Sequence, residues 1–350
     1  MQVLARIEAL FRQHRNNPAL LLKDEFDLIA GTSTGAIIAA GLSWGLSVAE
    51  IEQYFVRESA TMFTKASWSD QWKTRYTAQY LTASFKRFFS EDGEGREPAL
   101  LGTKRLRTLL LLVMRNATTG SAWPVMNNPA AMFNDPALED SNLRIPLWQL
   151  VRASTAAPTL FPPEQIRLGA REMIFVDGAI TPYNNPALIA FLMATLPCYR
   201  LNWETGVRKL EIVSVGTGRA RAVLTKGKAR NIHLLDAALY VIPALLDGMA
   251  LEQDLMCRVL GKCDYGEEID LEMKALVPEA QGLGPLEDRR FRYVRYEHRF
   301  LPEEVEMMKA TRKTNALGVD NVQLIPVLKD VGRAFAEANV QAAHLGFAAD

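Results

Sequence analysis

The sequence predicts an α/β fold in which helices cover a largely parallel sheet. Short apolar runs typical of buried strands occur at residues 26–30, 173–176 and 210–215, and each is followed by glycine or polar turn residues. Segments with the apolar spacing of helices lie between these runs. Strands that alternate with helices favour a sheet with helices packed on its faces, so we expect an α/β sandwich.

The expected elements follow one another in a simple order. Apolar residues at helical spacing from Val3 to Phe11 predict an amphipathic helix at the start of the chain. The strand at residues 26–30 precedes a helix rich in alanine and isoleucine, and Ser47 and Glu50 have the spacing of a capping box that begins another helix. The later elements that we expect are strands at 108–114, 173–176, 210–215 and 291–296 and helices at 234–260 and 322–343.

Length and composition favour a soluble globular protein with a substantial core. Of the 350 residues, 49% are hydrophobic and 23% are charged, which is an ordinary balance for such a protein. The sequence has no internal repeat and no long low-complexity linker. We therefore expect residues 1–190 to form a catalytic core and residues 191–350 to complete the same fold with additional helices.

Charge and cysteine usage narrow the function classes. The 40 basic and 40 acidic residues cancel, whereas a nucleic-acid-binding protein usually has a basic excess, so no nucleic-acid partner is expected. Cys198, Cys257 and Cys263 form neither a disulfide framework nor a zinc-binding pattern, and no metal or cofactor is expected. The first residues lack the apolar core of a signal peptide, so we expect a cytoplasmic protein with free thiols.

A serine between two glycines carries the main chemical signal. Gly31, Ser33 and Gly35 lie between a predicted strand and a predicted helix, which is the arrangement of a nucleophilic serine at a sharp turn. Side chains at the two glycine positions are expected to collide across such a turn. The following helix directs its first amides toward the serine oxygen, and the Thr34 amide is the expected donor to an oxyanion. A chance glycine turn is the alternative interpretation.

The serine needs a base, and the sequence offers two candidates. Asp177 directly follows a predicted strand, and the tight turn allowed by Gly178 would let its carboxylate point back toward Ser33. Taken alone, the pair is explained more simply as an Asp-Gly turn. His233 would complete the chain order of an α/β-hydrolase triad. In that fold several strands precede the nucleophile, and 32 residues cannot hold them, so Asp177 is the preferred base.

Together these motifs resemble the catalytic pair of the patatin-like phospholipases. The similar segments are GTSTG at 31–35, DGA at 177–179, VRASTAAPTLFPP at 151–163, NNPA at 184–187 and VSVGTG at 213–218. The resemblance implies a patatin-like three-layer α/β/α sandwich and a lipid acyl hydrolase with a serine–aspartate dyad. In such a dyad Ser33 would attack the ester carbonyl and Asp177 would act as general base, with no metal or cofactor.

The resemblance also implies a segment that these 350 residues do not contain. Members of the family begin with a strand and a loop of the Asp-Gly-Gly-Gly-x-Arg-Gly type, whose amides contribute to the oxyanion hole. The present sequence opens inside the helix that follows this loop, so we expect an incomplete oxyanion hole in which the Thr34 amide remains. The alternative hypothesis is a truncated, catalytically impaired protein that binds lipid without hydrolysing it.

An aromatic and basic stretch raises the question of membrane contact. Aromatic residues at four-residue steps and nearby basic residues occupy one stretch: Lys65, Trp68, Trp72, Lys73, Arg75, Tyr76, Tyr80, Phe85, Lys86, Arg87, Phe88 and Phe89. Such a helical face could dock peripherally on lipid headgroups. A core-facing aromatic stripe with solvated lysines is the simpler interpretation. The sequence does not determine the oligomeric state.

Overall fold

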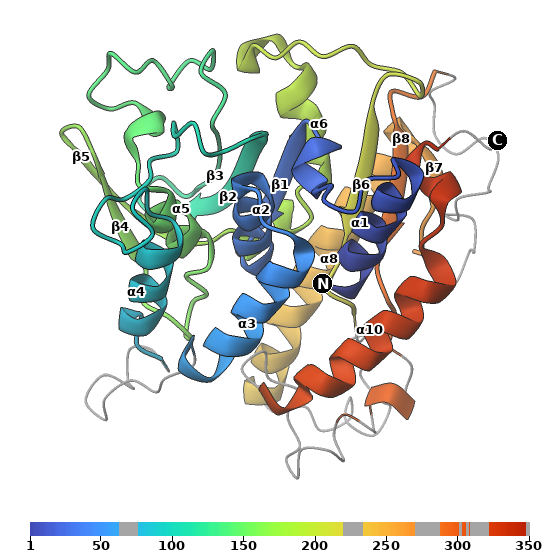
Figure 1. Ribbon diagram of the computed structural model, residues 1–350. Helices are drawn as coiled ribbons and strands as arrows, with labels where there is room; N and C mark the ends of the chain where they lie inside the picture. The colour runs from blue at the N-terminus through green and yellow to red at the C-terminus, as the bar shows by residue number, and fades with distance from the viewer. Residues whose placement is uncertain are drawn as a thin grey trace. The chain divides into compact units, whose positions relative to one another are not determined.

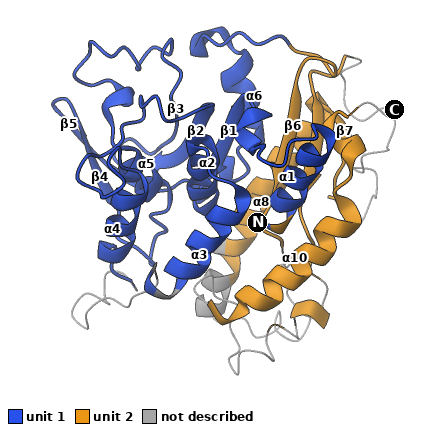
Figure 2. Ribbon diagram, in the orientation of Figure 1, with its two compact units in different colours: residues 1, 3–204 blue, residues 2, 205–350 orange. Residues whose placement is uncertain are grey.

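The computed structural model describes residues 1–62, 76–219, 234–269, 288–300, 303–305, 308 and 322–347. These residues divide into two compact units, which contain residues 1 and 3–204 and residues 2 and 205–350 (Figure 2). Up to residue 204 the helices are α1 (Gln2–His14), α2 (Thr34–Trp44), α3 (Val48–Met62), α4 (Gln79–Phe88), α5 (Leu147–Ser154) and α6 (Ala187–Thr195) (Figure 1). The strands of the same unit are β1 (Leu28–Thr32), β2 (Leu109–Asn116), β3 (Ser121–Met126), β4 (Glu164–Leu168) and β5 (Arg171–Asp177).

Strand β2 is the centre of the first sheet. Strand β1 pairs with it in parallel, whereas β3 and β5 pair with it in the antiparallel direction, and β4 pairs with β5. The predicted α/β class is confirmed, and in detail this sheet is mixed. Strands β4 and β5 form a hairpin whose turn includes Gly169 with φ of +59°, and this reversal makes β5 run against β2.

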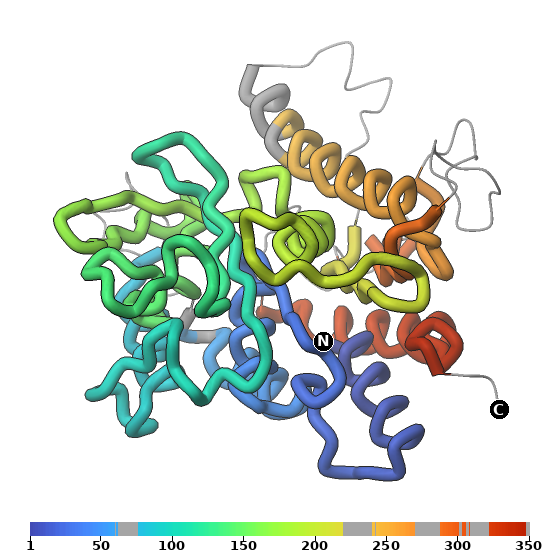
Figure 3. Tube along the Cα trace, turned by 90° about the horizontal axis from the view of Figure 1, so that it is seen from above, coloured from blue at the N-terminus to red at the C-terminus, as the bar shows by residue number. Residues whose placement is uncertain are grey.

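Successive residues of β2 face two separate apolar cores. Leu112 and Met114 pack in a cluster with side chains of α2, α4 and α5, whereas Val113 packs with Ile189 and Met193 of α6. Because successive side chains of a strand point to opposite faces, helices cover both sides of this sheet (Figure 3). The first unit therefore has the expected three layers.

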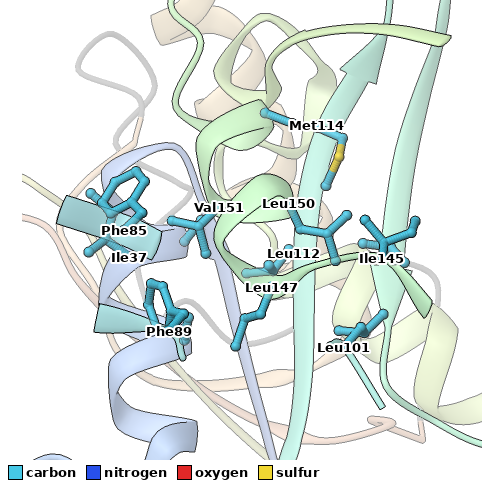
Figure 4. Close-up of a cluster of buried hydrophobic side chains, with 14 of the residues drawn as sticks. Ile37, Phe85, Phe89, Leu101, Leu112, Met114, Ile145, Leu147, Leu150 and Val151 are labelled. Atoms are coloured by element: carbon cyan, nitrogen blue, oxygen red, sulfur yellow. The ribbon is translucent and has the colours of Figure 1, made fainter. Parts of the chain in front are cut away.

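Helix α5 is held against the sheet by its apolar face. Figure 4 shows its side chains beside those of α2, α4 and β2. The labelled members of this cluster from helices are Ile37, Phe85, Leu147, Leu150 and Val151, and Phe89 directly follows α4. Leu147, Leu150, Val151 and Ser154 follow one another at the spacing of one helix face. The same spacing that buries the apolar residues therefore also buries Ser154, which is 0% exposed.

The second unit has a parallel sheet of its own. Strands β6 (Glu211–Val215) and β7 (Lys262–Tyr265) each pair in parallel with β8 (Arg292–Tyr296). The helix expected at 234–260 is α8 (Leu234–Leu260), and the strand expected at 291–296 is β8. The helix expected at 322–343 is divided into a 3₁₀ turn (Val322–Leu324), α10 (Ile325–Asn339) and a second 3₁₀ turn (Ala342–Leu345).

Most expected elements of the first unit are confirmed, including the capping box of α3. There the Ser47 amide donates to Glu50 Oε2 at 2.8 Å, and the Glu50 amide donates to Ser47 Oγ at 3.2 Å. Strands β3 and β4 were not predicted. Pro124 inside β3 argues against a strand, but β3 pairs with β2 alone among the described strands, so a residue without an N–H group is tolerated.

Part of the aromatic and basic stretch falls outside the described residues, namely Lys65, Trp68, Trp72, Lys73 and Arg75. In the part that is described, Phe85 and Phe89 are fully buried, and Lys86 and Arg87 are exposed. Core packing accounts for these aromatic residues, whereas Tyr80 is 56% exposed. Among the helices that the structure describes, none is both long and apolar enough to cross a bilayer.

Candidate active site

Two strand ends meet beside β2. Strand β3 pairs with residues 111–116 along one edge of β2. On the other edge of β2, β1 pairs with residues up to 113 and β5 pairs with residues 114–116. Strand β1 ends beside Val113, and β5 ends beside Met114. Because β1 runs parallel to β2 and β5 runs against it, their carboxyl ends point toward each other. Ser33 directly follows β1 and Asp177 ends β5, so the pairing brings these two residues together.

Ser33 lies in a strained turn between β1 and α2. Its φ is +56° and its ψ is −126°, a region that residues other than glycine rarely occupy. The amide of Ser33 donates a hydrogen bond to Ser154 Oγ at 3.0 Å. The side chain is half-buried, and the next residue, Thr34, is exposed at the start of α2. The sharp strand-to-helix turn expected from the sequence is therefore present.

The two glycines that flank Ser33 have different roles. A Cβ atom at Gly31 would lie 2.1 Å from the carbonyl oxygen of Gly35, so the turn has no room for a side chain there. At Gly35 a Cβ atom would have no atom within 4 Å apart from its chain neighbours and the backbone of its own helix. The expected collision is therefore correct for Gly31 and wrong for Gly35, because a Cβ atom at Gly35 would meet no atom across the turn.

This difference makes a prediction about stability. Gly31→Ala should lower the free energy of unfolding by at least about 1–3 kcal/mol, because backbone atoms must move to admit the methyl group. Gly35→Ala should change it by less than about 1 kcal/mol, since the methyl group meets no neighbour and alanine is a good helix former. Urea unfolding of the two variants measures both values. Equal losses in the two variants would contradict the geometric explanation.

Each carboxylate oxygen of Asp177 accepts a hydrogen bond. Ser33 Oγ donates to Oδ2 at 2.6 Å, and the Ala179 amide donates to Oδ1 at 2.7 Å. The residue is 2% exposed. Burial raises the pKa of Asp177 to about 6, against the lowering effects of the Ser33 hydroxyl, the Ala179 amide and the positive charge of Arg152. Because a buried carboxylate binds a proton more readily than an exposed one, Asp177 is a stronger base than an ordinary aspartate.

Gly178 allows the turn after β5 to approach β2 closely. A Cβ atom at this position would lie 2.2 Å from the Val113 carbonyl oxygen and 2.9 Å from Thr32 Cγ2. Any side chain here would push the end of β5 away from the end of β1. The tight Asp-Gly turn expected from the sequence is present, and it lies against the residues that precede Ser33.

Arg152 supplies a buried positive charge to this region. It is 0% exposed, its Nη2 donates to the Pro162 carbonyl oxygen at 2.7 Å, and its guanidinium carbon lies 5.6 Å from the centre of the Phe161 ring. Burial lowers the pKa of Arg152, and the negative charges of Glu164 and Asp177 raise it. The charge of Arg152 therefore favours the ionised form of Asp177.

The start of α2 provides backbone donors beside Ser33. The first amides of a helix have no acceptor within the helix, and the helix dipole gives this end a partial positive charge. The Thr34 amide is the first amide of α2 and directly follows the nucleophile candidate. Thr34 is an exposed residue, whereas Ser33 before it is half-buried.

The sequence-predicted candidates are thus placed unequally. Ser33, Thr34, Asp177 and Gly178 lie together at the junction of β1, α2 and β5. His233 lies outside the described residues, so its distance from Ser33 is not defined. Sequence reasoning missed the contact of Ser154 with the Ser33 amide, although Ser154 lies in the motif at residues 151–163. The signal in the sequence that could have indicated this contact was a serine on the apolar face of the helix at α5.

Comparison with known proteins finds similarity to phospholipases and to a patatin. The chain is 29% identical over 204 residues to an intracellular phospholipase A2 of Caenorhabditis elegans, 26% over 224 residues to a cGAMP-activated phospholipase of Vibrio cholerae, and 24% over 234 residues to patatin-16 of Solanum tuberosum. These alignments cover 55%, 62% and 62% of this chain and 16%, 59% and 56% of the respective relatives. The chain therefore spans less than two thirds of the length of each of these relatives.

The crystal structure of VipD from Legionella pneumophila also matches, with a TM-score of 0.33 and 12% identity over 96% of this chain and 64% of VipD. The model of the patatin-like phospholipase family matches residues 3–191, which is more than half of the chain and includes Ser33, Ser154 and Asp177. By this match the chain belongs to the patatin-like phospholipase family.

Proposed function

We propose that this chain hydrolyses acyl esters of lipids, with Ser33 as nucleophile and Asp177 as general base. One observation carries the proposal: a hydroxyl on a strained strand-to-helix turn donates a 2.6 Å hydrogen bond to a buried carboxylate. The relatives named as phospholipases support a lipid ester as the substrate class. Turnover of a nitrophenyl ester and of a phospholipid by the purified chain, compared with Ser33→Ala, tests the proposal.

The proposed reaction has two halves that use the same pair. Ser33 Oγ attacks the ester carbonyl carbon while its proton passes to Asp177 Oδ2, which it already contacts. The protonated carboxyl then gives the proton to the departing alcohol, and an acyl-serine remains. Water attacks this acyl group, its proton passes to Asp177, and the proton returns to Ser33 Oγ as the fatty acid leaves.

Asp177 is suited to this exchange by its environment. Its pKa of about 6 leaves Asp177 ionised at neutral pH. This pKa is also closer to the operating pH than that of an exposed aspartate, which makes Asp177 a better general base. The Ala179 amide holds the other carboxylate oxygen, so Oδ2 stays directed at Ser33. Arg152 favours return of the carboxylate to its charged state after each proton transfer.

This environment predicts the pH dependence of the reaction. The folded-state pKa of Asp177 is raised, and only the ionised form accepts a proton, so kcat/KM should fall as pH decreases through about 6. An exposed aspartate would place this fall near pH 4. Initial rates on an uncharged ester between about pH 4 and about pH 9 measure the profile. A fall centred near pH 4 would show that burial does not control the base.

The oxyanion hole of the proposed site needs backbone donors beside Ser33. We assign the Thr34 amide as one donor, because it begins the helix whose dipole favours negative charge beside Ser33. The glycine-rich loop implied by the family resemblance is the proposed source of further donors. No run of three glycines occurs in the 350 residues.

A further inference from the structure

Ser154 forms two hydrogen bonds at the junction of the proposed dyad. Its Oγ accepts from the Ser33 amide at 3.0 Å and donates to the Val113 carbonyl oxygen at 2.6 Å. The hydroxyl is therefore used as donor and acceptor at once. Ser154 is 0% exposed, so water cannot replace either partner in the intact fold.

Both partners of Ser154 belong to elements that carry the dyad. The Ser33 amide lies in the turn with φ of +56°, which is unfavourable unless surrounding contacts hold it. Val113 lies beside the end of β1, and its carbonyl oxygen is the atom that Gly178 approaches directly after Asp177. One hydroxyl therefore connects the Ser33 turn to the β2 residue against which the Asp177 turn packs.

The remaining contacts of α5 explain why this hydroxyl is well placed. Leu147, Leu150 and Val151 fix the helix on the sheet through the core, and Ser154 follows on the same face. The Asp177 amide donates to the carbonyl oxygen of Ala156, two residues after Ser154, at 3.0 Å. Ser154 at the end of α5 thus contacts the Ser33 turn, and Ala156 just after the helix contacts the end of β5.

We propose that Ser154 is a positioning residue that holds the strained Ser33 turn so that Ser33 Oγ points at the Asp177 carboxylate. This inference rests on the proposed hydrolysis at Ser33. Ser154 itself does not touch the reacting ester. Without its hydroxyl the Ser33 turn loses its amide partner and relaxes, and the nucleophile moves away from the base.

Ser154→Ala tests the proposal against a matched control in the same helix end. Thr155 is 8% exposed, and its Oγ1 donates to the Val151 and Arg152 carbonyl oxygens at 3.0 and 3.1 Å, so Thr155→Ala removes a buried hydroxyl without contact to the dyad. Ser154→Ala should lower kcat about 10²-fold with little change in KM, as expected for displacement of a reacting group by about 1 Å. Thr155→Ala should keep kcat within about threefold of the parent chain, even if its melting temperature falls.

A second variant and a non-kinetic readout guard against simple loss of folding. Ser154→Cys keeps a weak donor and acceptor, so its kcat should lie between those of the parent chain and Ser154→Ala. Hydrogen exchange of the Ser33 amide should be faster in Ser154→Ala and unchanged in Thr155→Ala, because only the first change removes its acceptor.

The outcomes separate this inference from the proposed function. A Ser154→Ala variant with the kcat of the parent chain, or with a loss no larger than that of Thr155→Ala, would overturn the positioning role while Ser33-dependent turnover stands. A parent chain whose turnover survives Ser33→Ala would overturn the proposed function itself. Slow turnover, fast Ser33 amide exchange and an unchanged KM in Ser154→Ala alone would support the inference.

Discussion

Ser33→Ala is expected to reduce ester turnover by about 10⁴-fold or more, because removal of a nucleophile leaves only the contribution of binding and oxyanion donors. The variant keeps the turn, since the Ser33 contact with Ser154 is made by the backbone amide and not by the side chain. Turnover of a short-chain nitrophenyl ester and of a phospholipid vesicle measures the loss. Covalent labelling by a fluorophosphonate, read by mass spectrometry, should disappear in the same variant.

Ser121→Ala is the control for this prediction. Ser121 is an exposed serine at the start of β3, and its side chain contacts Thr119 away from the proposed dyad. Its loss should leave the rate unchanged. Activity that survives Ser33→Ala would disprove the assignment of the nucleophile. A folded parent chain that binds lipid vesicles but hydrolyses neither substrate would favour the alternative of a lipid-binding, catalytically impaired protein.

Asp177→Asn should lower kcat by about 10²–10⁴-fold, because the amide preserves the shape of the side chain but cannot accept the Ser33 proton. The acid limb near pH 6 should disappear from whatever activity remains. Initial rates across the pH range measure both effects. His233→Ala should change the rate little. An inactive His233 variant together with an active Asp177→Asn variant would replace the dyad by a histidine-dependent mechanism.

The same substitution should stabilise the fold at neutral pH. The pKa of Asp177 is raised on folding, so the folded state binds the proton more tightly, and stability is lost as pH rises from about 4 through about 6. A pKa of about 6 in place of 3.8 corresponds to a cost of about 3 kcal/mol for the ionised side chain above pH 6. Thermal melting at pH 8 should therefore show a higher midpoint for Asp177→Asn. A lower midpoint would mean that the carboxylate contacts outweigh its burial.

Local pattern determined much of the first unit. The apolar run before Gly31 and the small residues after Thr34 predict a strand and a helix with Ser33 between them, and β1 and α2 have this order. The placement of Asp177 at the end of a strand follows in the same way from the residues around it. These features depend on side-chain periodicity and on the positions of glycines. Both are local properties of the sequence.

Partner choice among strands could not be predicted from such patterns. In a largely parallel sheet, the strands before Ser33 and Asp177 would both end at the same sheet edge. Here the two residues meet because β5 runs against β2 and ends beside Met114, next to the end of β1 beside Val113. Strand direction depends on contacts between residues far apart in the sequence and on the β4–β5 hairpin, whose first strand was not predicted.

The difference between Gly31 and Gly35 and the role of Ser154 were also decided only by the tertiary structure. Gly31 and Gly35 look equivalent in the sequence, yet only Gly31 lies against backbone atoms of the turn. Ser154 is separated from Ser33 by 121 residues, and nothing in either local sequence records their hydrogen bond. The sequence by itself determined which residues bear the candidate chemistry. The tertiary structure decided which of them touch, because hydrogen bonds and close packing depend on distances in space that local patterns do not encode.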